Sequence, residues 1–127
     1  MTLKILLALS LAATPVAAIA QSMNAESFHQ RAQALKKKGA MAIFSRGEIN
    51  ALGKEGQAAV LKAREQRLAA VKAGTKPRYC PPEGKNSMNS DEFMERLGAL
   101  PAADRARIDM TEATIRILAA KFPCKAG

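Results

Sequence analysis

The chain is poor in aromatic residues, with no tryptophan, one tyrosine and four phenylalanines among its 127 residues. Single-stranded nucleic acid stacks on aromatic side chains, so this shortage argues against nucleic acid as a partner. No stretch alternates apolar and polar residues with the β-branched and aromatic enrichment typical of strands. The sequence therefore predicts an all-α protein, a small compact bundle of four to six helices.

Histidine and cysteine are also scarce: His29 is the only histidine, and Cys80 and Cys124 are the only cysteines. Two cysteines and one distant histidine make an incomplete ligand set for a metal. No serine, cysteine or carboxylate is tied to His29 by a recognisable motif, so no nucleophile–base pair emerges. We predict no catalytic, metal-binding or cofactor-binding residue and a protein that is not an enzyme. His29 itself is expected at the surface or at its boundary.

Residues 1–20 have the pattern of a secretory signal peptide. One positive charge precedes an uncharged apolar run, and Ala18 and Ala20 place small residues at the third and first positions before a cut. The competing interpretation is a membrane anchor, but the apolar run is short for a span. Cleavage before Gln21 would leave residues 21–127 as one periplasmic domain without a stable membrane anchor.

The two cysteines predict a disulfide. An even number of cysteines in an exported protein favours pairing, and here only Cys80 and Cys124 are available. Both stand beside prolines. In the chain-entropy model, closing a loop of this length stabilises the fold by about 4 kcal/mol, which suits a small exported domain.

The formal net charge is +9, and the basic residues gather in the middle of the chain. Residues 31–85 contain 13 basic and 4 acidic residues, whereas residues 86–127 contain 6 of each. Such a field favours an acidic protein, anionic lipid or anionic polymer as partner. A well-solvated helix surface is the simpler alternative. The lysines at 36–38 also suit the negative end of a helix dipole.

Capping signals and apolar spacing predict two helices and a short apolar segment in the first half. Asn24 is a plausible N-cap and Gly39 a plausible C-cap of the first helix. The apolar segment 40–44 is expected to be a helical turn that plugs the core. Ser45 and Glu48 resemble a capping box that opens a long helix ending near residue 73.

Three glycines weaken the first half of that long helix: Gly47, Gly53 and Gly56. We expect either close packing there or two helices with a bend near residues 54–56. In the second half one side is apolar and the other is a thin face of alanines that allows another helix to approach. The apolar side comprises Val60, Leu61, Leu68 and Val71, and the thin face Ala59, Ala63 and Ala70.

The last third predicts a loop over residues 75–88 followed by three helical segments. Asn89 or Ser90 caps a helix that runs to about residue 98, and a helical turn follows over residues 102–108. Asp109 caps the last helix, which runs to about residue 121. Its buried stripe is expected to comprise Ile115, Leu118, Ala119 and Phe122, with Arg116 and Lys121 facing water.

The stretch between the cysteines carries a family resemblance. Its motifs are Tyr79-Cys80-Pro81-Pro82-Glu83-Gly84, Glu92-Phe93, Leu97, Pro101, Arg105, Thr111-Glu112-Ala113, Leu118-Ala119 and Phe122-Pro123-Cys124. In them the chain resembles the Rap/Tai family of periplasmic immunity proteins, which protect bacteria from peptidoglycan-cleaving amidase toxins delivered by type VI secretion. The resemblance implies a compact helical domain that often forms a homodimer and needs no cofactor.

Two hypotheses of function follow. The first, implied by the resemblance, is an immunity-type protein that binds a secreted cell-wall hydrolase, an amidase toxin. The second is a basic periplasmic protein that binds an anionic envelope component or an unfolded client protein. Neither hypothesis identifies individual partner-binding residues.

Overall fold

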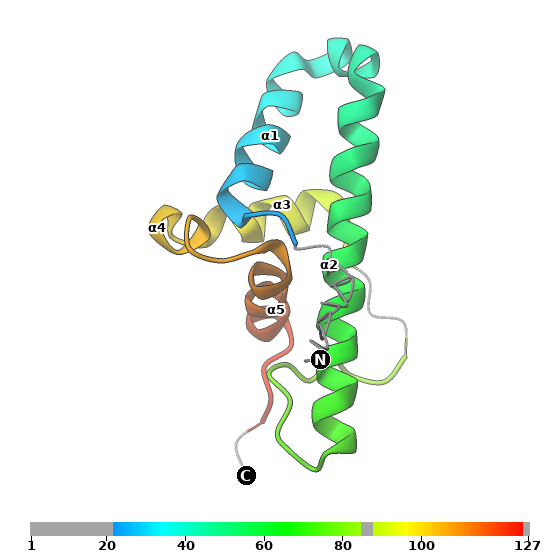
Figure 1. Ribbon diagram of the computed structural model, residues 1–127, viewed down its shortest axis with the longest axis vertical. Coiled ribbons are helices and arrows are strands. Elements are labelled where there is room, and N and C mark those ends of the chain that lie inside the picture. Colours follow the sequence, from blue (N-terminus) through cyan, green and yellow to red (C-terminus); the bar gives the residue numbers. More distant parts are fainter. Residues whose placement is uncertain (1–21, 85–87, 126–127) are drawn as a thin grey trace, which may run out of the picture.

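The computed structural model describes residues 22–84 and 88–125 (Figure 1). This part of the chain forms five α-helices and one 3-10 helix and contains no strand, which confirms the predicted all-α fold. The elements are α1 (Ala25–Lys38), η1 (Gly39–Ser45), α2 (Arg46–Lys72), α3 (Ser90–Ala99), α4 (Ala102–Arg105) and α5 (Met110–Lys121). The predicted signal peptide, residues 1–20, lies outside the described residues.

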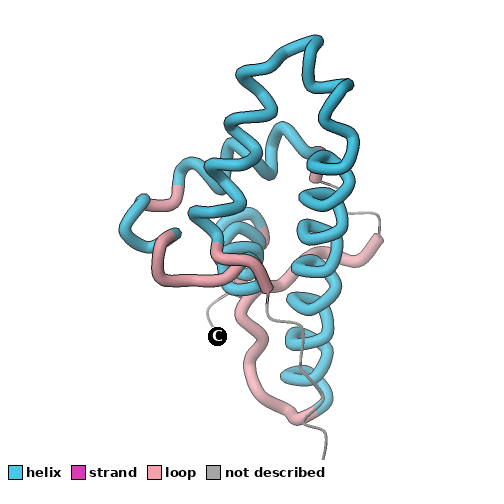
Figure 2. Tube along the Cα trace, turned by 45° about the horizontal axis from the view of Figure 1, so that its top comes forward, coloured by secondary structure: helices cyan, strands magenta, loops and turns pink. Residues whose placement is uncertain are grey.

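The long helix α2 runs along the whole molecule, and the other helices gather beside it (Figures 1 and 2). α1 and α2 form a hairpin that is joined at one end by η1. α3 and α5 lie below α1, and α5 packs along the middle of α2. From the end of α2 the chain returns as a loop to the C-terminal end of α5.

Three helices begin at caps that the sequence predicts. The side-chain oxygens of Asn24, Asn89 and Asp109 accept hydrogen bonds from the backbone N–H three residues on, at 3.0, 2.8 and 2.8 Å. Gly39 ends α1 with φ of +54°, a value that favours glycine over residues with a Cβ. The structure thus confirms these predicted caps. They could be predicted because each depends only on neighbouring residues.

The core lies where α1, α3 and α5 meet α2. Its fully buried large side chains include Leu97, Met110 and Ile117, and Phe28 packs edge-on against Phe93 at 6.5 Å between ring centroids. On α2 the residues closest to α5 are alanines. Ala59 and Ala63 are buried, and Ala63 packs with Tyr79 and Ile115. The predicted approach of another helix to the thin alanine face is therefore confirmed.

Cys80 and Cys124 are joined in a disulfide, as predicted. The backbone N–H of Cys80 also donates to the carbonyl oxygen of Phe122 at 2.8 Å. The bridge and this hydrogen bond hold the loop after α2 against the end of α5.

Two expectations for the start of α2 were wrong. Ser45 makes no side-chain cap, and its hydroxyl accepts a hydrogen bond from Lys38 Nζ at 2.8 Å. Glu48 instead pairs with Arg31 of α1 through two hydrogen bonds of 2.6 and 2.7 Å. The three glycines neither divide α2 nor pack closely, since a Cβ built on any of them meets nothing within 4 Å.

The burial of α5 also differs from the expected stripe. Ile115 is buried, but Leu118, Ala119 and Phe122 are only half-buried. Contacts with α1, α2 and α3 instead bury most of its first two turns. The buried residues there are Met110, Thr111, Ala113, Thr114, Ile115 and Ile117. Lys121 does not simply face water, because its Nζ lies 2.8 Å from both carboxylate oxygens of Glu92.

Two smaller departures concern Arg116 and the segment before α5. Arg116 is half-buried and pairs with Glu112 at 3.0 Å, so it too is not simply facing water. The helical turn expected over residues 102–108 is shorter, since α4 ends at Arg105.

Candidate protein-binding groove

The large exposed apolar side chains of the described residues all lie on one continuous segment, η1 and α2. They are Met41, Ile43, Phe44, Ile49, Val60, Leu61, Leu68 and Val71. The apolar side that the sequence predicts for the second half of α2 therefore faces solvent, while the alanine face packs against α5. Exposed apolar side chains that gather on one part of a small domain mark interaction sites.

Part of this surface is the wall of a groove between α1, α2, α3 and α5. Its volume is about 860 Å³. Ala32 and Leu35 line it from α1, and Ile49, Val60 and Leu61 line it from α2. The buried Leu52 and the half-buried Phe93, Leu118 and Phe122 also line it. Among the described residues, no charged side chain lines the groove, so its lining suits an apolar ligand or peptide segment.

Two of the glycines that weaken α2 help to form this groove. Gly53 and Gly56 line it, and the space where a Cβ would stand is empty within 4 Å. Larger residues there would narrow the space between α1 and α2. Residues 49, 53, 56 and 60 recur at helical spacing, so they share one face of α2. That spacing is the sequence signal that could have indicated the groove.

Both acidic residues in the first half of α2, Glu48 and Glu55, accept hydrogen bonds from other parts of the fold, so their charges are engaged. The Glu48 carboxylate accepts from Arg31, and this hydrogen bond lowers the pKa of Glu48 and raises the pKa of Arg31. The Glu55 carboxylate accepts from the backbone N–H of Met23 at 2.5 Å. Lys54 and Arg64 of α2 remain exposed.

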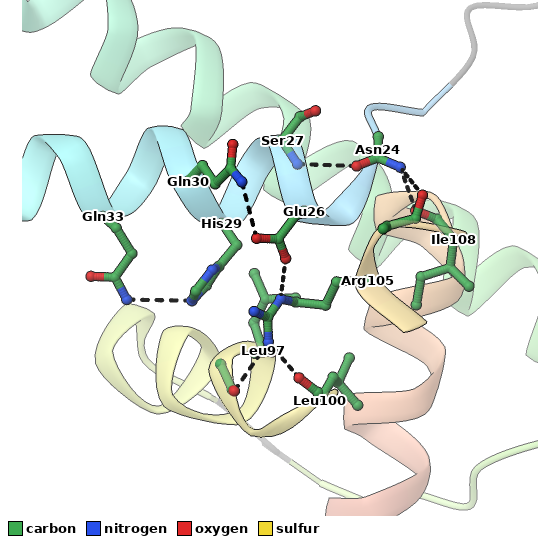
Figure 3. A network of polar contacts seen from close by, with 12 residues as sticks. Asn24, Glu26, Ser27, His29, Gln30, Gln33, Leu97, Leu100, Arg105 and Ile108 are labelled. Carbon is green, nitrogen blue, oxygen red and sulfur yellow. Dashed lines mark hydrogen bonds and ion pairs between the residues drawn. The ribbon is translucent and has the colours of Figure 1, made fainter. Parts of the chain in front are cut away.

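The sole histidine lies in a different polar cluster, between α1 and the α3–α4 turn (Figure 3). His29 is half-buried, as expected for a boundary residue, and burial lowers its pKa. The centre of the cluster is the buried Arg105, whose Nε donates to Glu26 at 2.5 Å. Nη1 of Arg105 donates to the carbonyl oxygens of Gly98, at 3.1 Å, and Leu100.

This cluster holds the fold together. Its arginine donates to a carboxylate and to main-chain oxygens, and it fixes the turn between α3 and α4 against α1. Asn24 adds a second link, because its Nδ2 donates to the carbonyl oxygen of Ala106 at 2.9 Å. Arg105 is among the residues that carry the Rap/Tai resemblance, and the structure gives it a scaffold role.

Within residues 22–84 and 88–125, no three histidine, cysteine or acidic side chains lie together in a way that could hold a metal ion. No helix in the same ranges combines the length and apolar character that crossing a membrane requires. Comparison of the chain with protein-family models, with curated proteins and with solved structures finds no match.

Proposed function

We propose that this chain is an exported binding protein of the immunity type, which neutralises a secreted cell-wall amidase by stoichiometric binding. The observation that carries the proposal is the open, mainly apolar groove, which none of the described charged side chains lines. A groove of this kind is suited to an inserted protein segment. The resemblance of residues 79–124 to the Rap/Tai family supports the choice of an amidase as partner, and a periplasmic location follows from it.

The groove favours a particular kind of contact. Its α2 wall presents apolar residues at helical spacing, as do proteins that receive an amphipathic helix in a groove. Hydrophobic contact inside the groove would supply most of the affinity. The surrounding surface is basic, so acidic residues on the partner would speed association, and this rate should fall as salt rises.

The disulfide supports the same function indirectly. Binding loses less free energy when the site is already rigid in the free protein. Cys80 and Cys124 fix the end of α5, and Phe122, two residues before the bridge, lines the groove. The cross-link therefore restrains one side of the site.

A pair of leucines on α2 provides a matched test. Leu61 is 58% exposed and lines the groove, whereas Leu68 is 47% exposed and is not among the lining residues. The protein, or a variant, is co-expressed in the periplasm with an amidase encoded beside it. Lysis and co-purification are measured. We expect Leu61→Asp to abolish both co-purification and protection, and Leu68→Asp to retain them.

Two results would contradict the proposal. If cells lyse equally with and without the wild-type protein and the two proteins do not co-purify, the immunity function fails for that pair. If Leu61→Asp protects as well as wild type, the groove is not the contact surface. Circular dichroism of both variants checks that the fold is retained.

A further inference from the structure

A second apolar surface lies at the end of the α1–α2 hairpin, and the groove does not account for it. We call residues 36–46 the hairpin tip. Its three large apolar side chains are strongly exposed: Met41 by 63%, Ile43 by 56% and Phe44 by 81%. None of them lines the groove. In Figure 1 the tip is the cyan turn at one extreme of the molecule, and the C-terminal end of α5 is far from it.

The same tip is strongly basic. Lys36, Lys37, Lys38 and Arg46 are all exposed. Between Glu26 and Glu48 the sequence contains no acidic residue. Glu48 itself is paired with Arg31, so it does not offset the charge of the tip.

We propose that the hairpin tip is a membrane-docking element that binds anionic phospholipid. Met41, Ile43 and Phe44 enter the boundary between headgroups and acyl chains, and the lysines and Arg46 contact the phosphates. Apolar insertion combined with several basic residues is the pattern of proteins that lie on a membrane without crossing it. This inference does not rest on the proposed function, because groove and tip share no residue.

Three features favour a lipid surface over an acidic protein as the partner. The tip is a protruding end of the molecule, which can enter a fluid interface without a shaped pocket. Three of its four basic residues are lysines, whose mobile point charges suit laterally mobile phosphates, whereas planar, fixed acceptors favour arginine. Residues 39–45 are helical, so local hydrogen bonds satisfy much of the backbone that would enter the interface.

Because the chain contains no tryptophan, a single introduced tryptophan reports on the tip alone. Phe44→Trp in the mature protein is titrated with vesicles of phosphatidylglycerol mixed with phosphatidylcholine. We expect a blue shift of the emission, and quenching when the acyl chains are brominated. Vesicles of phosphatidylcholine alone should give a much smaller effect. Leu68→Trp, in the second half of α2 and away from the tip, is the control and should not shift.

Charge variants in vesicle sedimentation separate local recognition from net charge. Replacing Lys36, Lys37 and Lys38 together by glutamine should weaken binding to the anionic vesicles by about a hundredfold. Replacing Lys72, Lys76 and Lys125 by glutamine removes the same charge from exposed positions outside the tip and should change binding much less.

Three results would overturn the proposal: no shift of the tryptophan at position 44, equal binding to neutral vesicles, or equal weakening by the two lysine triples. If the tip variants instead lose co-purification with an amidase while vesicle binding is absent, the tip is a protein contact. Circular dichroism confirms that each variant is folded.

Discussion

Arg105 offers the sharpest test of how this fold is held together. It is the only charged residue among the buried side chains of the described chain, with 7% of its surface exposed. Its guanidinium reaches the carboxylate of Glu26 in α1 and the carbonyl oxygens of Gly98 and Leu100 at the end of α3 (Figure 3). We predict that Arg105→Met, which keeps an unbranched apolar stem but removes the guanidinium and its donors, strongly destabilises the protein.

The magnitude follows from the groups that lose their partner. Two main-chain carbonyl oxygens lose a charged donor, and each such loss costs about 1–2 kcal/mol. The carboxylate of Glu26 is left without its cation as well. We expect the free energy of unfolding to fall by about 2–4 kcal/mol, a large fraction of the roughly 5–15 kcal/mol typical of a small domain.

Urea unfolding followed by far-ultraviolet circular dichroism, with the disulfide intact, measures the change. With a slope of roughly 1–2 kcal/mol per molar urea, the midpoint should drop by about 1–4 M. Arg107→Met is the matched control, because Arg107 is exposed and lies two residues further on. It should stay within about 0.5 kcal/mol of wild type. If Arg105→Met unfolds within about 1 kcal/mol of wild type, the scaffold role is refuted.

Three further predictions concern stability. Replacing Cys80 and Cys124 together by alanine should lower the free energy of unfolding by about 2–5 kcal/mol, and thiol labelling of the unreduced wild type should find no free cysteine. Hydrogen bonds from basic side chains lower the pKa of four glutamates: Glu26 (from Arg105), Glu48 (Arg31), Glu92 (Lys121) and Glu112 (Arg78). At acidic pH the folded state therefore binds fewer protons than the unfolded state. The contribution of these glutamates to stability is complete above their ordinary pKa of 4.5 and is lost as the pH falls below it. A urea midpoint that is the same at about pH 6 and about pH 3 would contradict this linkage. Gly53→Ala should raise the free energy of unfolding by up to about 1 kcal/mol, because the glycine is inside a helix and a Cβ there meets nothing within 4 Å; a decrease in a thermal melt would show hidden crowding.

The sequence predicted features that depend on near neighbours. The caps at Asn24, Asn89 and Asp109 need only a side chain and the backbone three residues away, and all three are present. The disulfide could also be predicted from the sequence, because two cysteines allow only one pairing. Features that depend on which helix lies opposite were predicted less well.

The two faces of α2 show why. Val60 and Leu61 have the larger apolar area, so area alone assigns them to the core. The structure buries Ala59 and Ala63 instead, since only a face of small side chains lets α5 approach closely. The side chains that would have marked the core remain exposed, and they form the wall of the groove. Periodicity therefore located the two faces of α2, and only the small size of the alanines indicated which face a neighbouring helix could cover.

The prediction for residues 40–44 was wrong for a different reason. It was expected to plug the core, but the chain turns at Gly39 beyond the helices that could cover it. Met41 and Phe44 are consequently among the exposed apolar side chains of the molecule. The first residues of the described chain are, by contrast, held against the fold. The N–H of Met110 donates to the carbonyl oxygen of Met23 at 2.7 Å, so this segment is held beside the start of α5.

The lengths of the helices explain why a chain of this size keeps so much apolar surface open. At 1.5 Å per residue, the 27 residues of α2 span about 40 Å, whereas the 12 residues of α5 span about 18 Å. α1 flanks the other part of α2, and the groove lies in the space between α1 and α2 (Figure 2). A longer α5 alone would not fill that space, since Gly53 and Gly56 line the groove on α2 and have no side chains to extend into it. An occupant from outside the described chain would complete the core there, which is the physical basis for treating the groove as a binding site.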